Sequence, residues 1–98
     1  MPKESDIQSK IAKWLRSKGC FVWKCQQNAT TQRGVADLFF CYRSKHGFLE
    51  VKKSANAPFR DGQKDFLEHH SRWVFAQVVY PENFAIIQQE IEEYIRDA

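Results

Sequence analysis

The chain has 98 residues, of which 43% are hydrophobic and 28% charged, and its formal net charge is +3. Chains of this size and composition bury a single core, so we expect one globular domain over residues 1–98. No apolar run approaches the ~20 residues of a membrane-spanning helix and the polar N-terminus does not resemble a signal peptide, so we expect a cytoplasmic protein without a membrane partner.

The hydrophobic pattern predicts the order α-β-β-β-α-β-α. Ile7, Ile11 and Leu15 recur at helical spacing, and Gly19 is placed to end this first helix. Aromatic and β-branched runs predict four strands, over 20–25, 35–42, 47–53 and 72–80. Helical patterns predict further helices over 63–70 and from Pro81 onward, with polar loops over 26–34 and 54–62.

The cysteines and histidines do not predict a zinc site. Cys20, Cys25 and Cys41 are odd in number and lack the CxxC spacing of zinc ligands, so we expect free thiols. His69 and His70 are adjacent, and adjacent helical side chains face different directions.

The charge is distributed unevenly along the chain. Residues 1–53 hold 11 Lys and Arg against 4 Asp and Glu, a balance of +7. Residues 54–98 hold 4 against 8, a balance of −4. The asymmetry has two interpretations, a polyanionic partner on one side of the molecule or ordinary solvated charge.

Charged residues interrupt the two most strand-like segments, "GVADLFF" (34–40) and "GFLEVKK" (47–53). In a hairpin with a tight turn near Arg43–Lys45, Asp37 lies opposite either Glu50 or Lys52. Because strand side chains alternate, all three share one face in either register. We therefore expect two carboxylates and one ammonium to meet on one side of an otherwise apolar sheet.

Two interpretations of this group compete. The first is a buried ion pair with a spare carboxylate, but each buried ion costs on the order of several kcal/mol. The second is a metal site, since Mg²⁺ binds one or two carboxylates together with waters and phosphate oxygens. As a bare pattern, Asp followed by Glu-x-Lys is weakly specific, and its position on strands is what favours metal-assisted hydrolysis of a phosphodiester.

At these residues the chain resembles the PD-(D/E)XK nuclease superfamily, and within it the virus-type replication–repair nuclease (VRR-NUC) domain. The matching stretches, in family order from Glu4 to about Ile95, are "ESDIQSKIAKWLRSKG", "VWKCQQN", "GVADLFF", "FLEVKK", "GQKDFL" and "AQVVYPENF". Ala36 replaces the family's proline before the aspartate, and "FRDG" replaces its Ser-Pro helix start. The resemblance implies an α/β fold with a restriction-endonuclease-like αβββαβ core, in which helices flank a mixed four-stranded sheet, followed by a C-terminal helix.

The resemblance also implies a metal site. Asp37 and Glu50 would bind Mg²⁺, for which Mn²⁺ would substitute, and the backbone carbonyl of Val51 would be a third ligand. Glu4 would be an accessory ligand, direct or through water; alternatively it is an acid favoured by the dipole of the first helix.

Two further residues take catalytic roles by resemblance. Lys52 would orient the attacking water or offset charge in the transition state, and the second role is preferred because a lysine ammonium is a poor base at neutral pH. Gln63 would hold the scissile phosphate or the waters of the metal; alternatively it faces solvent on its helix.

The polar segment before the Asp37 strand is expected to contact the nucleic-acid backbone, because amide, hydroxyl and guanidinium groups are common partners of phosphates and sugars. The residues assigned to this contact are Asn28, Thr30, Thr31, Arg33 and, beyond the hairpin, Lys53. Lys10, Lys13 and Lys24 either extend this surface or serve solubility.

The leading hypothesis is a Mg²⁺-dependent DNA endonuclease. Stand-alone domains of the family resemble Holliday-junction resolvases, so the resemblance implies a homodimer that cuts branched DNA in DNA repair, in a bacterial or phage-infected cell. The alternatives are a nicking or flap-type nuclease of the same fold, a restriction-like or RNA-directed nuclease, a non-catalytic nucleic-acid-binding module and a structural interaction domain. The intact set of Asp37, Glu50 and Lys52 argues against the last two.

Overall fold

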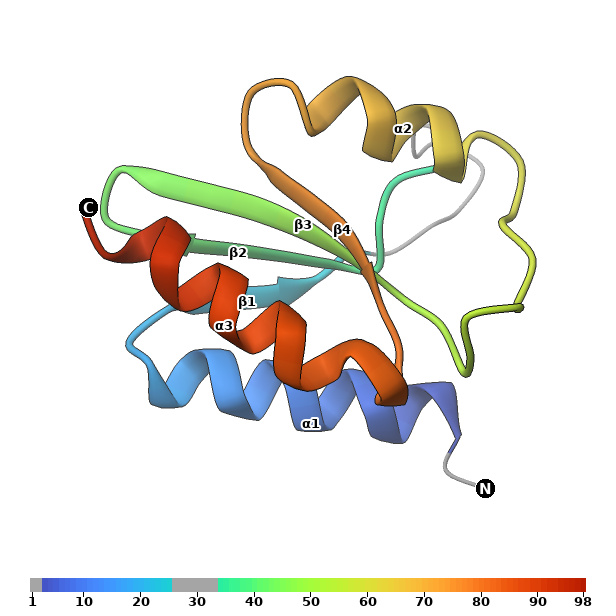
Figure 1. Cartoon of the computed structure of the whole chain (residues 1–98), viewed down its shortest axis with the longest axis horizontal. Coiled ribbons are helices and arrows are strands. Elements are labelled where there is room, and N and C mark those ends of the chain that lie inside the picture. The colour runs from blue at the N-terminus through green and yellow to red at the C-terminus, as the bar shows by residue number, and fades with distance from the viewer. Residues whose placement is uncertain (1–2, 26–33) are drawn as a thin grey trace.

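The computed structural model describes residues 3–25 and 34–98. Its elements are α1 (Glu4–Ser17), β1 (Phe21–Lys24), β2 (Leu38–Tyr42), β3 (Lys45–Val51), α2 (Gln63–His70), β4 (Phe75–Val79), the 3₁₀ turn η1 (Pro81–Asn83) and α3 (Phe84–Ile95). This order confirms the predicted α/β class (Figure 1). No helix in these residues is long and apolar enough to cross a membrane.

The four strands form one mixed sheet in the order β1-β2-β3-β4. The β1–β2 and β2–β3 pairs are antiparallel, whereas β3 and β4 are parallel. A parallel pair needs a long crossover connection, and the segment that contains α2 supplies it.

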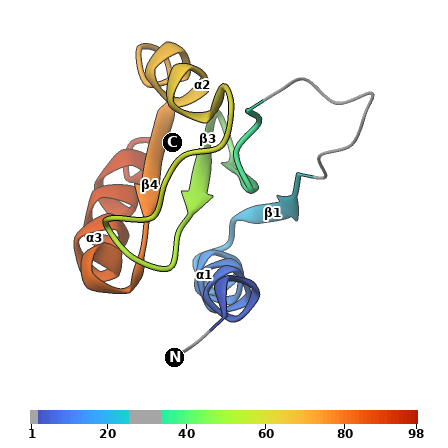
Figure 2. The same cartoon turned by 90° about the vertical axis from the view of Figure 1, so that its right-hand side faces the viewer.

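The helices divide between the two faces of the sheet. α1 and α3 cover one face, and α2 lies over the other (Figures 1 and 2). The larger core lies between the sheet and the α1–α3 layer, with Leu15, Phe40, Leu49 and Ile91 at its centre. A smaller cluster lies beneath α2 and consists of Ala36, Phe66, Leu67 and Ala76.

Two backbone features set the ends of these elements. Gly19 has φ +91° directly after α1, and the N–H of Cys20 donates to the carbonyl of Leu15, so the predicted helix stop is confirmed. The β2–β3 turn is tighter than expected: β3 begins at Lys45, and Arg43 takes a left-handed φ of +54°. A two-residue turn fixes the register of a hairpin.

Most strand ends differ from the sequence prediction by a residue or more: β3 covers Lys45–Val51 and leaves out Lys52 and Lys53, and two other differences concern Asp37 and β4. Asp37 lies just before β2 and not within it. Residues 72–74 belong to a turn, and β4 begins only at Phe75. Both differences shorten a strand at its end, where side-chain pattern carries the least information.

Candidate active site

Asp37 and Glu50 lie side by side at one end of the β2–β3 hairpin. Leu38 pairs with Leu49, which places Asp37 opposite Glu50 and settles the choice between the two registers. The backbone N–H of Val51 donates to Asp37 Oδ2 at 2.9 Å, so the strand itself holds this carboxylate. The two residues are 7% and 1% exposed.

Gln63 joins this pair from α2, of which it is the first residue and which covers the face of the sheet that carries the two carboxylates. Its Nε2 donates to Glu50 Oε2 at 2.7 Å. Its Oε1 accepts from Lys52 Nζ at 3.0 Å and from the backbone N–H of Arg60 at 2.7 Å. Gln63 is fully buried, so the alternative of a solvent-facing side chain is wrong.

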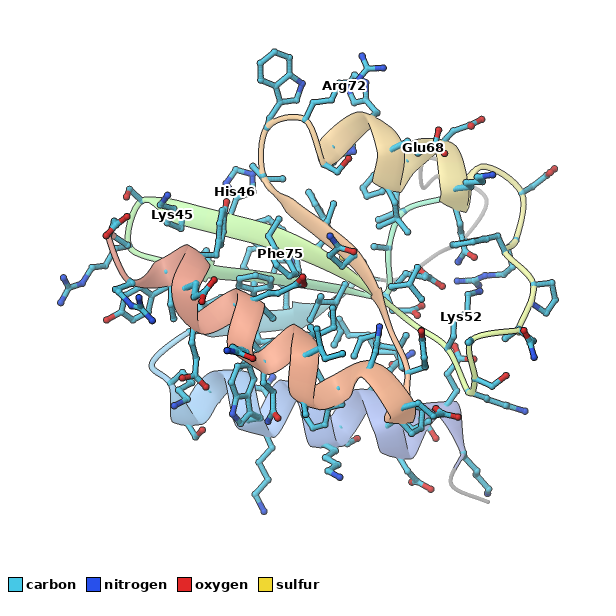
Figure 3. The ribbon with its side chains drawn as sticks, viewed as in Figure 1. Lys45, His46, Lys52, Glu68, Arg72 and Phe75 are labelled. Atoms are coloured by element: carbon cyan, nitrogen blue, oxygen red, sulfur yellow. The ribbon has the colours of Figure 1, made fainter. Side chains whose placement is uncertain are left out.

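Lys52 directs its ammonium inward. Besides Gln63, Nζ donates to the carbonyl of Pro58 at 2.9 Å and lies 3.4 Å from Glu50 Oε2. The residue lies beyond β3, at the opposite end of the strand from Lys45 (Figure 3). Lys52 therefore supplies a fixed positive charge beside Glu50.

A close approach of two glycines places α2 over the sheet. Gly34 and Gly62 have φ of +79° and +80°, where side chains are disfavoured. A Cβ on Gly34 would lie 2.3 Å from the backbone carbon of Gly62. The segment that leads to Asp37 thus touches the start of α2, and this contact brings Gln63 within reach of Glu50.

The environment of Glu50 disfavours its ionised form. Burial raises the pKa of this carboxyl to about 7, and repulsion from Asp37 adds to the effect, while Lys52 and Arg60 oppose it. Its Oε1 is buried and has no hydrogen-bond partner among the described residues. A buried carboxylate oxygen without a donor, beside a second carboxylate, fits a hard cation such as Mg²⁺.

Arg60 is the residue that sequence reasoning missed. Its guanidinium lies 3.4 Å from Asp37 Oδ1 and 3.9 Å from Glu50 Oε2, and its side chain is 56% exposed. Arg60 stands in a polar loop without periodicity, so no local pattern indicates where its side chain lies.

The roles of the remaining predicted residues stay untested. Glu4 begins α1, and within the described chain no three acidic, histidine or cysteine side chains are grouped to hold a metal. The accessory role of Glu4 and the carbonyl ligand at Val51 therefore stay predictions. Lys53 is exposed after β3. Outside the described residues lie Asn28, Thr30, Thr31 and Arg33.

One solved structure, described as a "VRR_NUC domain", matches this chain with a TM-score of 0.75 and 26% sequence identity. This chain has the fold of a VRR_NUC domain. The match covers 96% of this chain and 99% of that one. It confirms the resemblance drawn from the sequence motifs. No protein-family model and no curated protein matches the chain.

Proposed function

We propose that this chain is a Mg²⁺-dependent DNA endonuclease that hydrolyses phosphodiester bonds. The observation that carries the proposal is the opposed pair of Asp37 and Glu50, in which Glu50 Oε1 is buried without a donor among the described residues. The likeness to a VRR_NUC domain, a name that denotes a nuclease, supports the same activity.

Each residue of the site has a role in this proposal. Asp37 and Glu50 hold Mg²⁺, which when bound supplies the charge that stabilises the transition state of phosphodiester hydrolysis. Gln63 donates to Glu50 Oε2 and so orients this carboxylate. Lys52 places an ammonium 3.4 Å from the same oxygen and offsets negative charge that develops on the phosphoryl group. The carbonyl of Val51 would be a third ligand, and the carboxylate of Glu4 would be an accessory ligand, direct or through water.

For the substrate we infer branched DNA, cut by a homodimer with two active sites. The excess of positive charge in residues 1–53 supports a polyanionic partner. Symmetric cleavage of a junction needs two sites related by a two-fold axis. Phe21 and Trp23 on β1 are 63% and 44% exposed and contact each other, which supports an apolar contact between subunits.

A cleavage assay tests the proposal. Four-way, flap, single-stranded and duplex DNA are incubated with the protein and Mg²⁺, Mn²⁺ or EDTA, and light scattering reports its mass with and without a junction. We expect cleavage of the four-way junction with either metal and none with EDTA. Asp37→Asn and Glu50→Gln should each lower the rate by at least about 100-fold, since each removes a ligand charge. Asp97→Asn, the same change near the C-terminus, should leave it unaltered.

The other outcomes separate the alternatives. DNA binding without cleavage under every condition would leave a non-catalytic binding module. Cleavage restricted to flaps or single strands by a monomer of 11.6 kDa would leave a nicking or flap-type nuclease.

A further inference from the structure

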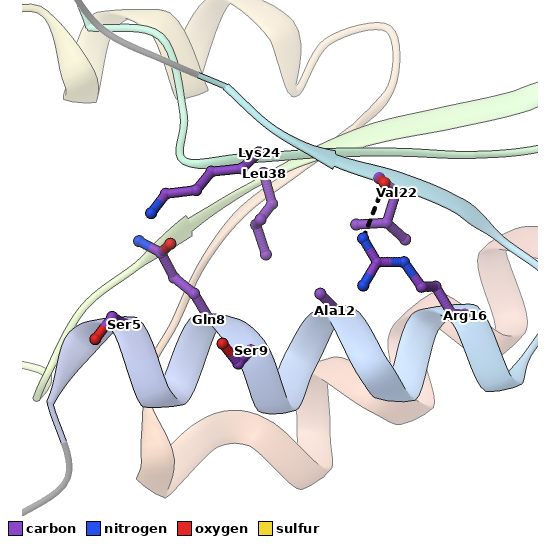
Figure 4. Close-up of a pocket in the computed structure, with 8 residues that line it drawn as sticks. All are labelled: Ser5, Gln8, Ser9, Ala12, Arg16, Val22, Lys24 and Leu38. Atoms are coloured by element: carbon purple, nitrogen blue, oxygen red, sulfur yellow. Dashed lines mark hydrogen bonds between the residues drawn. The ribbon is translucent and has the colours of Figure 1, made fainter.

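A second polar site lies on the opposite face of the sheet from the carboxylate pair. It is a pocket of about 260 Å³ between α1 and the β1–β2 strands (Figure 4). Its lining residues are Ser5, Gln8, Ser9, Ala12, Arg16, Val22, Lys24 and Leu38. None of them belongs to the group around Asp37 and Glu50.

Two cations line this pocket. Arg16 donates from Nη2 to the carbonyl of Val22 at 3.2 Å, which orients the guanidinium, and its other N–H groups have no partner among the described residues. Lys24 is exposed, and within the described chain its ammonium has neither a hydrogen bond nor an ion pair. No carboxylate is among the described residues that line the pocket, so none of these residues neutralises the two charges.

The pocket also contains a buried polar group, the side-chain amide of Gln8. The residue is only 9% exposed, and its Oε1 is buried without a hydrogen-bond partner in the described residues. The side chains of Gln8 and Lys24 extend toward each other across the pocket (Figure 4). A buried acceptor without a donor is costly, and an ammonium with three donors that approaches it can satisfy it.

One bound anion would satisfy both the two uncompensated cations and the buried oxygen of Gln8. An oxyanion in the pocket accepts from Lys24 and from a free N–H of Arg16, and it draws the lysine inward. The same ammonium then donates a second hydrogen bond to Gln8 Oε1. The hydroxyls of Ser5 and Ser9 line the same pocket and add neutral donors.

The pocket also lies close to the carboxylate pair along the strands. Lys24 pairs with Leu38, the residue directly after Asp37. The N–H of Cys25 donates to the carbonyl of Asp37 at 2.8 Å. Lys24 therefore stands at the end of β1 that is adjacent to Asp37 in the sheet.

We propose that this pocket binds a backbone phosphate of the nucleic acid, next to the bond that is cut. Lys24 and Arg16 donate to the phosphate, and Gln8 is a positioning residue that orients the ammonium of Lys24. The inference rests on the proposed function in one respect, that the phosphate belongs to the substrate strand.

Binding measured in EDTA tests the pocket apart from catalysis. The fluorescence anisotropy of a labelled four-way junction and of a labelled single strand is followed over a series of salt concentrations. Lys24→Gln should weaken binding about 5- to 10-fold and reduce the slope of log K against log salt by about one. Arg96→Gln removes the same charge from an exposed position after α3, outside the pocket, and it should weaken binding less than about twofold.

A double-mutant cycle tests the role of Gln8. Gln8→Met conserves the length of the side chain, and it should weaken binding about threefold in the wild-type background and have no further effect beside Lys24→Gln. A purely structural role of Gln8 would give the same loss in both backgrounds and a lower Tm.

The outcomes that overturn the inference are distinct from failure of the nuclease proposal. If Lys24→Gln binds as tightly as Arg96→Gln, the pocket does not contact DNA. If inorganic phosphate shifts the side-chain amide NMR signals of Gln8 while DNA affinity is unaffected by Lys24→Gln, the pocket binds a free anion. If the wild type binds DNA through Lys24 but does not cleave it, the phosphate pocket is supported and the nuclease proposal is wrong.

Discussion

Arg60 places a guanidinium nitrogen 3.4 Å from Asp37 Oδ1, between the two carboxylates of the site. Because the side chain is more than half exposed and its loop is polar, this positive charge is held by the carboxylates and not by packing. A divalent cation at the same carboxylates competes with it.

The first prediction concerns metal affinity without DNA. Arg60→Gln should tighten Mn²⁺ binding about 3- to 10-fold, since it removes the competing charge at a partly solvated site. Isothermal titration calorimetry measures the change. Arg72→Gln, which removes an exposed guanidinium in the turn after α2, should leave the affinity unchanged. Equal or weaker binding by Arg60→Gln would show that Arg60 does not compete with the metal.

The second prediction is a pH dependence of stability. Burial raises the pKa of Glu50 from 4.5 to about 7. Between these two pH values the folded state retains the proton of Glu50 and the unfolded state has lost it. The stabilisation that this proton gives the folded state is therefore full below pH 4.5 and decreases until about pH 7. Glu50→Gln should therefore gain stability over the wild type as pH rises, up to about 3 kcal/mol above pH 7. Urea unfolding in EDTA from pH 5 to 8 measures this difference, and a constant difference would contradict the shift.

The same titration should govern metal binding. Mn²⁺ binds the ionised carboxylate, so its affinity should rise about tenfold per pH unit below pH 7 and level off above it. Calorimetry at pH 5.5, 6.5 and 7.5 measures this profile. A flat profile over this range would mean that Glu50 ionises at its ordinary pKa.

The third prediction separates structural from electrostatic effects at Lys52. The ammonium donates to Pro58 and Gln63 and pairs with Glu50, so Lys52→Met removes the positive charge beside a buried carboxylate and one donor each from the Pro58 and Gln63 oxygens. We expect a loss of about 2–4 kcal/mol in the free energy of unfolding at pH 8, measured in urea. Lys53→Met, at the next and exposed position, should change it by less than about 0.5 kcal/mol.

The fourth prediction tests the contact between the two glycines. Gly34→Ala adds a Cβ 2.3 Å from the backbone of Gly62, and it should cost about 2–3 kcal/mol of stability and slow cleavage, because α2 and Gln63 must shift. Gly19→Ala has a similar φ of +91°, but its Cβ would meet only the ring of Tyr42, at 3.3 Å. It should cost about 1 kcal/mol and leave cleavage unaltered. Equal effects of the two substitutions would assign the loss to backbone strain alone.

Much of the site could be predicted from local pattern. Side chains alternate along strands, so Asp37 and Glu50 had to share a face once two strands and a short turn were assigned. The choice between the two registers needed the turn itself, because a shift of two residues conserves the same alternation. The observed turn leaves Arg43 and Ser44 between the strands and pairs Leu38 with Leu49.

The sequence by itself determined the order of the elements, the shared face of Asp37 and Glu50 and the start of α2 at Gln63, because each depends on residues close together in the chain. Only the tertiary structure decided that Gln63 is buried against Glu50, that Arg60 lies between the carboxylates and that Gln8 and Lys24 share a pocket. These contacts join segments separated by loops or by the thickness of the sheet. Local propensity does not specify the path of a loop, which depends on which surfaces pack best when the whole chain is folded.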